Sequence, residues 1–479
     1  MIKNRFSGLC FVVSLVGLFL GTIIMLLANP AAAQDNQPEG PVYIVREGDS
    51  LWNIAQRFGV SLEDLSTLNN ISDPSQVIAG ARLLIPGLEG INGVLTTTSV
   101  PYGESMRSLS RRYRLPERML AKLNHLSSPS ELYAGYSLIL PENSPTVTDT
   151  QRALLSPGLS ILELSLLSGV NPWQIAGDSQ ISNTWQTVPG DILLMPGEST
   201  GGPAGFPGQL QALEINPLPL LQGKTSVIKV KGDDGLSLGG SLLDHRLNFF
   251  PEGDGYFALQ GIHAMTESGI YPLTITGTLQ DRTPFSYTQS VFVQAVDYPY
   301  DQPLTVNPTT IDPAVTRPED AQWTALAEPV TPDRMWSERF ELPSPLDVEY
   351  CLESNQCWTS RFGNRRSYNG SPYNAFHTGL DIAGGAGTKI FAPADGVVVF
   401  AGPLTVRGKA TMIDHGHGIY TGYMHQSEIY VEAGQAVKAG ELIGLVGGTG
   451  RVEGPHLHWE VWAGGVQVDP IDWLANIYP

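Results

Sequence analysis

The sequence predicts a multidomain, mainly β protein. The chain has 479 residues, more than one hydrophobic core usually serves, so three to five domains are expected. Gly (52) and Pro (36) are plentiful and only 16% of the residues are charged, which favours small β-rich modules joined by stiff linkers. Two patterns divide the chain further. A 55-residue repeat occupies its first half, and six of its nine histidines lie within residues 377–458.

The charge excludes one class of partner. The formal net charge is −19 at pH 7. A phosphate backbone would repel such a surface, so nucleic acid is not expected as a partner.

Residues 1–33 have the pattern of an export segment. Lys3 and Arg5 precede an uncharged apolar run over residues 6–27, and Ala31–Ala33 offer a small-residue cleavage site. The run is long for a signal peptide and close to the length that spans a membrane. We therefore interpret residues 1–33 as either a signal peptide or an N-terminal membrane anchor. In both cases the rest of the chain is expected outside the cytoplasm, secreted or membrane-anchored.

Three copies of one module follow. The turn glycines Gly48, Gly103 and Gly158 are 55 residues apart, and each is followed 38 positions later by a proline that closes an apolar run. Each copy is expected to fold as βααβ, with a serine as the N-cap of the first helix. In the first copy the helices are expected to bury Leu51, Ile54 and Ala55, and then Leu62, Leu65 and Leu68. The predicted modules are residues 42–87, 97–142 and 150–197.

The first copy resembles a LysM module through "YIVREGDSLWNIAQRFGVSLEDLSTLNN" and "IAGARLLIP". The resemblance implies binding to the N-acetylglucosamine glycan of peptidoglycan or chitin. The second copy is LysM-like and the third is degenerate. In the third copy Leu159 stands at the position of Asp49, and Ser179 stands at the position of Asn69. The later copies are therefore either further glycan-binding modules or spacers that keep only the fold.

The middle of the chain predicts a change of architecture. Residues 198–211 are rich in Gly and Pro and are interpreted as a linker. Short alternating runs over residues 212–297 predict an immunoglobulin-like antiparallel β-sandwich. We assign no chemistry to this sandwich and interpret its His245 and His263 as surface or turn residues.

Residues 298–345 contain nine prolines. They predict an extended, Pro-rich strap along the domain that follows, with a short helix starting near Pro318.

The histidine cluster carries the chemistry. His377 and Asp381 are four residues apart, which places both on one face of a strand or of a helical turn. His456 and His458 are two apart and share one face of a strand, and His425 lies between the two pairs in the sequence. Imidazole and carboxylate groups suit zinc. Catalytic zinc sites use three protein ligands and leave a fourth position open.

The stretch from about 361 to 473 resembles the lysostaphin/LytM family of zinc endopeptidases. The matching segments are "HTGLDIAGGAGTKIFAPADGVVVFAG", "IDHGHGIYTGYMHQS", "VEAGQAVKAGELIGLVGGTG" and "GPHLHWEVWAGGVQVDP". The resemblance implies a C-terminal antiparallel β-sheet peptidase domain over residues 346–479. It also implies cleavage of peptide cross-links or bridges in bacterial peptidoglycan.

The same resemblance assigns residue roles. It implies that His377, Asp381 and His458 bind Zn²⁺. It implies that His425 and His456 are the non-ligand histidines that activate water and stabilise the oxyanion.

Two departures from the family pattern leave these five residues intact. Arg451-Val452-Glu453 stands where smaller residues are usual and is expected to reshape one rim of the groove. Gln426 follows His425 where leucine is usual. The neighbouring His415 and His417 are interpreted as structural or groove-lining residues and not as ligands.

Two alternatives to an active enzyme remain. One is a non-enzymatic LytM-type regulator that activates a separate cell-wall amidase, which the loss of a metal ligand would favour. The other is a glycan-anchoring protein whose zinc only stabilises the fold.

Cys351 and Cys357 are expected to form a disulfide in an oxidising compartment. The alternatives are two free thiols or half of a metal site.

Overall fold

The computed structural model describes residues 41–88, 91, 93–142, 150–156, 158–198, 202–207, 210–233, 235–280 and 282–479. The predicted export segment lies outside these residues. Across the described parts of the chain, no helix is long and apolar enough to span a membrane. The first repeat, up to Thr96, forms one compact unit with the short segment that starts at Leu140, and the remainder forms a second unit.

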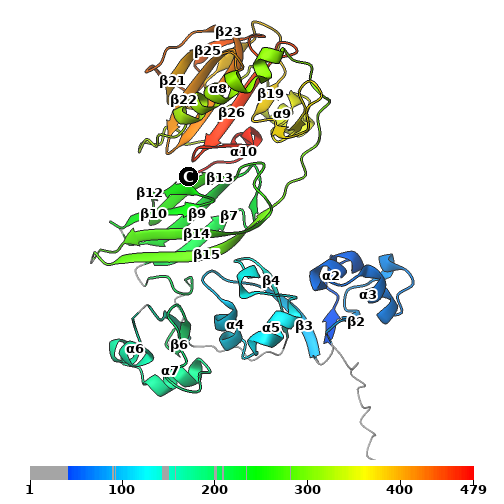
Figure 1. Ribbon diagram of the computed structural model, residues 1–479, viewed down its shortest axis with the longest axis vertical. Coiled ribbons are helices and arrows are strands. Elements are labelled where there is room, and N and C mark those ends of the chain that lie inside the picture. Colours follow the sequence, from blue (N-terminus) through cyan, green and yellow to red (C-terminus); the bar gives the residue numbers. More distant parts are fainter. Residues whose placement is uncertain are drawn as a thin grey trace, which may run out of the picture. The chain divides into compact units, whose positions relative to one another are not determined.

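The first repeat has the predicted βααβ order (Figure 1). Ser50 and Ser61 cap its two helices by accepting hydrogen bonds from backbone N–H groups. Leu65 is fully buried as expected, whereas Leu68 is 45% exposed. A three-residue step leaves Leu68 about 60° around the helix axis from Leu65, and Leu68 is the last residue of α3, so it lies at the edge of the buried face. The elements are β1 (Pro41–Ile44), α2 (Leu51–Phe58), α3 (Leu62–Leu68), η1 (Pro74–Gln76) and β2 (Arg82–Leu84).

The later repeats keep the two helices and the closing strand. The polar residue after the second helix, Asn69, Asn124 or Ser179, has a structural task in each copy. Asn124 donates to the carbonyls of Leu120 and Ile139 and accepts from the Ile139 N–H, so it ties the helix end to the closing strand. Ser179 makes the shorter version of this link through Leu194. The elements are β3 (Gly93–Ser99), α4 (Met106–Arg112), α5 (Glu117–Leu123), η2 (Pro129–Glu131), β4 (Ser137–Pro141), β5 (Thr150–Leu154), α6 (Ile161–Ser168), α7 (Pro172–Asp178) and β6 (Ile192–Pro196).

Two sheets follow and share one apolar core. One has the order β11-β10-β14-β15-β8 and the other β12-β13-β9-β7. Ile228 and Ala258 of the second sheet pack with Leu273 and Ile275 of the first. The strands are β7 (Leu210–Asn216), β8 (Leu220–Leu221), β9 (Thr225–Gly232), β10 (Ser237–Leu242), β11 (His245–Asn248), β12 (Phe250–Glu252), β13 (Gly255–Gly261), β14 (Gly269–Thr278) and β15 (Pro284–Gln294).

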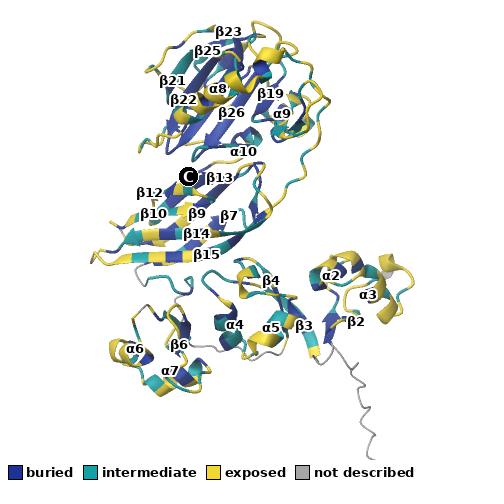
Figure 2. Ribbon diagram, viewed as in Figure 1, coloured by how far each residue is buried: buried dark blue, intermediate teal, exposed yellow. Residues whose placement is uncertain are grey.

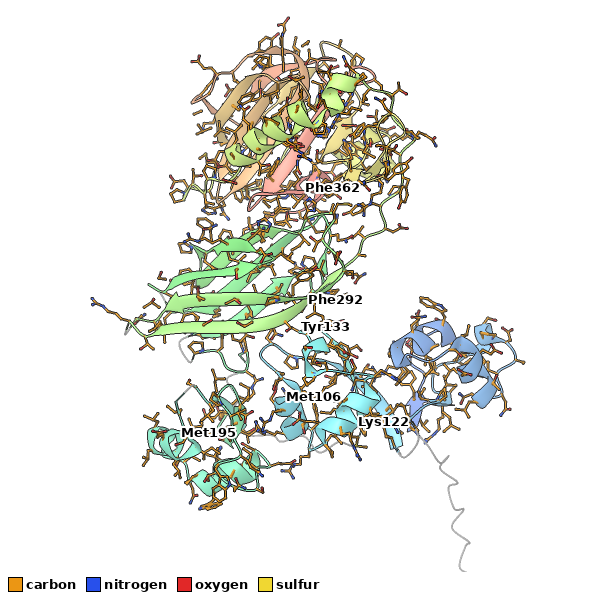
Figure 3. The ribbon with its side chains drawn as sticks, viewed as in Figure 1. Met106, Lys122, Tyr133, Met195, Phe292 and Phe362 are labelled. Carbon is orange, nitrogen blue, oxygen red and sulfur yellow. A yellow bond between two sulfur atoms is a disulfide. The ribbon has the colours of Figure 1, made fainter. Side chains whose placement is uncertain are left out.

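The second repeat contacts this pair of sheets. The ring of Tyr133 stacks on Phe292 of β15 with centroids 5.0 Å apart (Figure 3). The backbone N–H of Ala134 donates to the carbonyl of Ser290 beside it.

The C-terminal part is a ten-stranded sheet whose main path is β16-β19-β26-β23-β22-β21-β24. Every residue of β26 is buried (Figure 2), because both faces of the sheet are covered. Its strands are β16 (Trp358–Ser360), β19 (Leu380–Ile382), β20 (Lys389–Phe391), β21 (Gly396–Pro403), β22 (Lys409–Gly416), β23 (Ile419–Ile429), β24 (Ala436–Val437), β25 (Leu442–Val446), β26 (Leu457–Ala463) and β27 (Val466–Val468). The short β17 (Arg365–Arg366) and β18 (Ala375–Phe376) pair beside it.

The two-sheet region and the ten-stranded sheet share a core. Phe257 and Leu259 of β13 belong to the same buried cluster as Val468 and as Trp473 of α10 (Pro470–Ala475). A Cβ added at Gly261 would lie 2.8 Å from Val468, so the two parts meet without space between them. The core of the C-terminal sheet is therefore completed by residues that precede 346.

The Pro-rich strap packs on the other face. It contains η3 (Pro308–Ile311) and α8 (Pro313–Leu326), and Trp323 of α8 is fully buried among residues of the sheet. The helix begins at Pro313 with Asp312 as its cap, and not near Pro318. Proline is favoured at the first position of a helix, so Pro313 and Pro318 could each begin one, but only Pro313 follows a carboxylate that caps the helix.

The predicted disulfide is confirmed. Cys351, in α9 (Val348–Ser354), is bonded to Cys357, and their Cα atoms are 5.3 Å apart.

Candidate active site

Three of the predicted site residues meet at a point between two strands. β19 pairs antiparallel with β26, and the register sets Asp381 opposite His458. Asp381 Oδ1 lies 2.9 Å from His377 Nε2 and 2.8 Å from His458 Nδ1, and the two ring nitrogens are 2.9 Å apart. All three residues are buried. Among the described residues, His377, Asp381 and His458 form the group whose possible ligand atoms all lie within 4.8 Å of one another, close enough to hold a metal ion.

Hydrogen bonds on the outer side of each imidazole fix its orientation. His377 Nδ1 lies 2.8 Å from the carbonyl of Arg361, which can only accept, so the Nε2 lone pair faces the group. His458 Nε2 faces Glu460 at 3.4 Å, which leaves Nδ1 for the same point. Burial opposes ionisation of Glu460, but the hydrogen bond and charge of His458 outweigh it and lower the pKa of Glu460 to about 2.

Arg366 holds the other oxygen of Asp381. Its guanidinium lies 3.2 Å from Asp381 Oδ2 and 3.0 Å from Asp301 Oδ2 of the strap. Burial opposes ionisation of Asp381, but the surrounding histidines outweigh it and hold its pKa well below the usual range. Asp381 therefore offers a charged Oδ1 to the group while Oδ2 is occupied.

The two remaining histidines flank this group. His425 Nδ1 lies 2.8 Å from the Thr449 carbonyl and His456 Nδ1 lies 2.9 Å from the Gly454 carbonyl, so each ring leaves Nε2 unused by these contacts. The ring centroids are 5.1 Å apart, and His456 Nε2 is 3.5 Å from Asp381 Oδ1.

His425 is neutral at ordinary pH. Burial, together with the charges of His458 and His456, lowers its pKa to about 3. Its backbone has a φ of +63°, a conformation that non-glycine residues rarely adopt outside functional sites and tight turns.

All five residues line a groove of about 1030 Å³. One wall comes from the strap, including Leu304, Val306 and Asp320. His263 and Met265 of the two-sheet region also line it. His263 does lie in a turn, as interpreted from the sequence, but this turn borders the groove.

His415 and His417 lie apart from the group. His415 is fully buried, with Nδ1 2.7 Å from the Asp395 carbonyl and Nε2 2.8 Å from Thr421 Oγ1. His417 stacks on Phe250 at 3.7 Å. Both have the structural surroundings that the sequence suggested.

Sequence reasoning missed Glu460, Arg366 and Asp301. Glu460 could have been found, because it follows His458 by two residues and so shares its face of the strand. Arg366 and Asp301 gave no local signal: Arg366 reaches Asp381 from β17, and Asp301 of the strap reaches Arg366, so both contacts join residues far apart in the sequence.

Comparison with protein families defines the modules. Residues 375–470 match the model described as "Peptidase family M23", and residues 43–86 and 99–141 match the LysM domain. The chain therefore carries an M23 peptidase domain and two LysM domains.

Individual relatives resemble the peptidase region. The chain is 40% identical over 133 residues to the peptidoglycan DD-endopeptidase ShyA of Vibrio cholerae, covering 28% of this chain and 29% of that protein. It is 46% identical over 95 residues to the DD-carboxypeptidase/endopeptidase Mpg of Neisseria meningitidis, covering 20% and 22%. The chain thus matches less than a third of the length of each.

Solved structures include a putative peptidase M23 from Pseudomonas aeruginosa. It is 26% identical, covers 53% of this chain and 95% of its own, and superimposes with a TM-score of 0.39. Lysostaphin from Staphylococcus simulans is 32% identical, covers 22% and 46%, and has a TM-score of 0.21.

Proposed function

We propose that the chain is a zinc-dependent endopeptidase that cleaves peptide cross-links or bridges of bacterial peptidoglycan and is held at the wall by its LysM domains. The observation that carries this proposal is the meeting of two histidines and an aspartate inside a domain that matches the M23 peptidases. The names of the relatives make a cross-link between two D-residues the first substrate to test.

We propose that His377, Asp381 and His458 hold Zn²⁺. They supply two nitrogens and one oxygen, a donor set that catalytic zinc sites use, and each has a hydrogen-bond partner on its outer side. The bound ion would supply Lewis acidity to polarise the scissile carbonyl.

His425 and His456 are proposed as the catalytic residues. Both present Nε2 toward the groove beside the three ligands. A neutral imidazole can accept a proton from the attacking water and return it to the leaving amine. While it holds that proton, before passing it to the amine, the ring can donate a hydrogen bond to the developing oxyanion.

The remaining modules are proposed to deliver this site to the wall. Residues 150–197 are proposed as a degenerate LysM-like repeat, supported by α6, α7 and the strand pair β5–β6. Residues 212–297 are proposed as an immunoglobulin-like sandwich, supported by two sheets around one core. Residues 1–33 are proposed as a signal peptide or membrane anchor, so the protein works outside the cytoplasm. The proposed domains are 42–87, 97–142, 150–197, 212–297, the strap 298–345 and the peptidase domain 346–479, with a linker over 198–211.

Two variants of the full chain test this function on purified sacculi. His456→Ala should keep its zinc and lose about 10²–10⁴ in the rate of fragment release, as expected for a general base or oxyanion donor. Asp381→Ala should lose zinc and hydrolysis together. Mass spectrometry of released fragments and elemental analysis supply the readouts. The regulator hypothesis would be supported instead if the wild-type protein released no fragments and both it and His456→Ala stimulated an added amidase.

A further inference from the structure

The three repeats share one edge. In each, the loop before the closing strand lies beside the end of the opening strand, because a glycine N–H of the loop donates to a carbonyl there. The donors are Gly80, Gly135 and Gly190, and the acceptors are Val45, Val100 and Leu155. We call this place the loop edge. In the first repeat it comprises residues 46–52 and 75–80, and in the later repeats the positions one and two repeat lengths further along.

In the first repeat the loop edge is open. Trp52 is 60% exposed and Ile78 is 72% exposed. A Cβ added at Gly48 or at Gly80 would have no described atom within 4 Å apart from those of its chain neighbours. Large apolar side chains that a small module keeps in water on one edge are typical of a binding surface. The loop edge is therefore where the first LysM domain can take a ligand.

In the second repeat the side chains of the loop edge contact other parts of the same chain. The counterpart of Ile78 is Tyr133, whose ring stacks on Phe292 of β15 with the centroids 5.0 Å apart (Figure 3). The other counterpart, Arg107, forms an ion pair at 3.4 Å with Asp191 of the third repeat. Both positions that are exposed in the first repeat are thus used for internal contacts.

The backbone of this second loop edge is covered as well. A Cβ added at Gly103 would lie 1.8 Å from the carbonyl oxygen of Ala204, so the segment 202–207 sits directly on the turn. The N–H of Gly103 donates to the side chain of Gln289, and the N–H of Ala134 donates to the carbonyl of Ser290. A ligand could reach this edge only by displacing the two-sheet region.

The third repeat keeps its loop edge open. Leu162 and Val188 stand at the positions of the two exposed residues of the first repeat, and they are 55% and 48% exposed. A Cβ at Gly158 or Gly190 would again have no described atom within 4 Å beyond its chain neighbours. Trp185 adds a large ring, 76% exposed, where the other two repeats have serine. This edge therefore resembles that of the first repeat more than that of the second.

The chemistry of the third loop edge suits an uncharged glycan. Residues 158–162 and 182–190 contain no Asp, Glu, Lys or Arg except Glu-free positions beside amides and hydroxyls, namely Asn183, Gln186 and Thr187. A tryptophan offers a flat apolar surface and an N–H donor, which match the C–H face and the acetamido oxygen of an N-acetylated sugar. Amide side chains can both donate and accept hydrogen bonds with sugar hydroxyls. An anionic polymer would find no cation on this edge.

We propose that the wall glycan is bound by the loop edges of the first and third repeats, and that the second repeat uses the same edge only to dock on the two-sheet region. The ligand is an uncharged strand of N-acetylhexosamines. This rests on the proposed function and deepens it, because it states which modules hold the enzyme at the wall. The assignment departs from the sequence match, which includes the second repeat but not the third.

Calorimetry on the full chain tests this assignment with a soluble β-1,4-linked oligomer of N-acetylglucosamine. The oligomer contains no peptide, so the histidine site cannot cleave it. The wild-type protein should bind two oligomers per chain. Trp52→Ala/Ile78→Ala and Trp185→Ala/Val188→Ala should each weaken one of the two sites by about thirtyfold, the loss typical when an aromatic anchor is truncated. The variant with all four changes should keep neither site at wild-type affinity.

Trp173→Ala is the matched control. Trp173 is also a tryptophan of the third repeat and is 63% exposed, but it lies on α7, outside the loop edge. Its replacement should leave both sites at wild-type affinity. All the substituted side chains are exposed, so each variant should melt within a few degrees of wild type by circular dichroism.

Four outcomes would overturn the assignment. The first is a wild-type protein that binds no oligomer, and the second is a variant with all four changes that still binds one at wild-type affinity, since the second repeat would then be a glycan module. The third is a Trp185→Ala/Val188→Ala protein that keeps both sites. The fourth is the loss, in that variant alone, of binding to neutral phosphatidylcholine vesicles while oligomer binding is unchanged, which would assign the edge to lipid. A wild type that binds two oligomers but cuts no sacculi would refute the proposed hydrolysis and leave this assignment standing.

Discussion

The first repeat and the peptidase half are built over different distances along the chain. The first repeat is built mainly from residues 41–88. Its helix caps and the pairing of Val42 with Leu84 come from that segment, and β1 pairs on its other side with β3, which begins at Gly93. The peptidase site draws on Asp301 at one end and Glu460 at the other. A module built from a short segment can be recognised from the sequence of that segment. A site assembled over more than one hundred residues can be recognised only in part, because local sequence patterns identify only some of its residues.

The largest expected effect comes from cutting the chain at residue 346, the predicted N-terminal boundary of the peptidase domain. A fragment of residues 346–479 loses Phe257 and Leu259, which share its core, and Trp323, which covers its other face. Removing one buried large side chain typically costs about 2–5 kcal/mol, and a domain is stable by only about 5–15 kcal/mol in total. We therefore expect the fragment to show no cooperative thermal unfolding by circular dichroism.

A longer fragment provides the control. Residues 210–479 keep both covers and should melt cooperatively. If the short fragment melts as sharply and at the same temperature, the shared core contributes nothing to stability and the peptidase domain is as self-contained as the first repeat.

The same contrast explains what the sequence could predict. The residues His377, Asp381 and His458 were all candidates from their local spacings, and the structure brings them together because β19, which carries Asp381, pairs with β26, which carries His458. Arg366 was not a candidate, because nothing near it in the sequence indicates that its partner is Asp381. The start of α8 was placed near Pro318, whereas the helix begins at Pro313, where Asp312 supplies the cap.

Acid should affect the peptidase half through His415. Burial lowers its pKa to about 4, against 6.5 for an exposed histidine. Between these values the unfolded chain binds the proton and the folded chain does not, so stability falls as the pH is lowered from about 6.5 to 4. The difference of 2.5 pKa units amounts to about 3 kcal/mol at the acid end.

Comparing wild type with His415→Gln isolates this contribution. For each protein, chemical denaturation gives the free energy of unfolding at pH 4.5 and at pH 7. Carboxylates titrate alike in both proteins, so their contribution cancels when the two pH-dependent changes are compared. The variant should lose less stability on acidification. Residues 41–88 contain no histidine, so the first repeat cannot contribute such a slope. Equal slopes in the two proteins would show that His415 titrates normally.

The smallest effect is expected from making one repeat resemble another. Asn69 donates to the carbonyls of Leu65 and Leu84 and accepts from the Leu84 N–H, at 2.7–2.8 Å. A serine, as at position 179, can keep the link to the strand but not the one to the helix. Asn69→Ser should therefore lower the free energy of unfolding by about 0.5–1.5 kcal/mol, the usual net contribution of one hydrogen bond.

Asn124→Ser should cost more than Asn69→Ser, because Asn124 is only 4% exposed and the carbonyl it abandons has less access to water. Hydrogen exchange of the Leu84 and Ile139 amides reports each repeat separately within the full chain. An equal loss of protection in both variants would mean that burial of this link does not matter, and that the repeats differ in sequence without differing in how their closing strands are held.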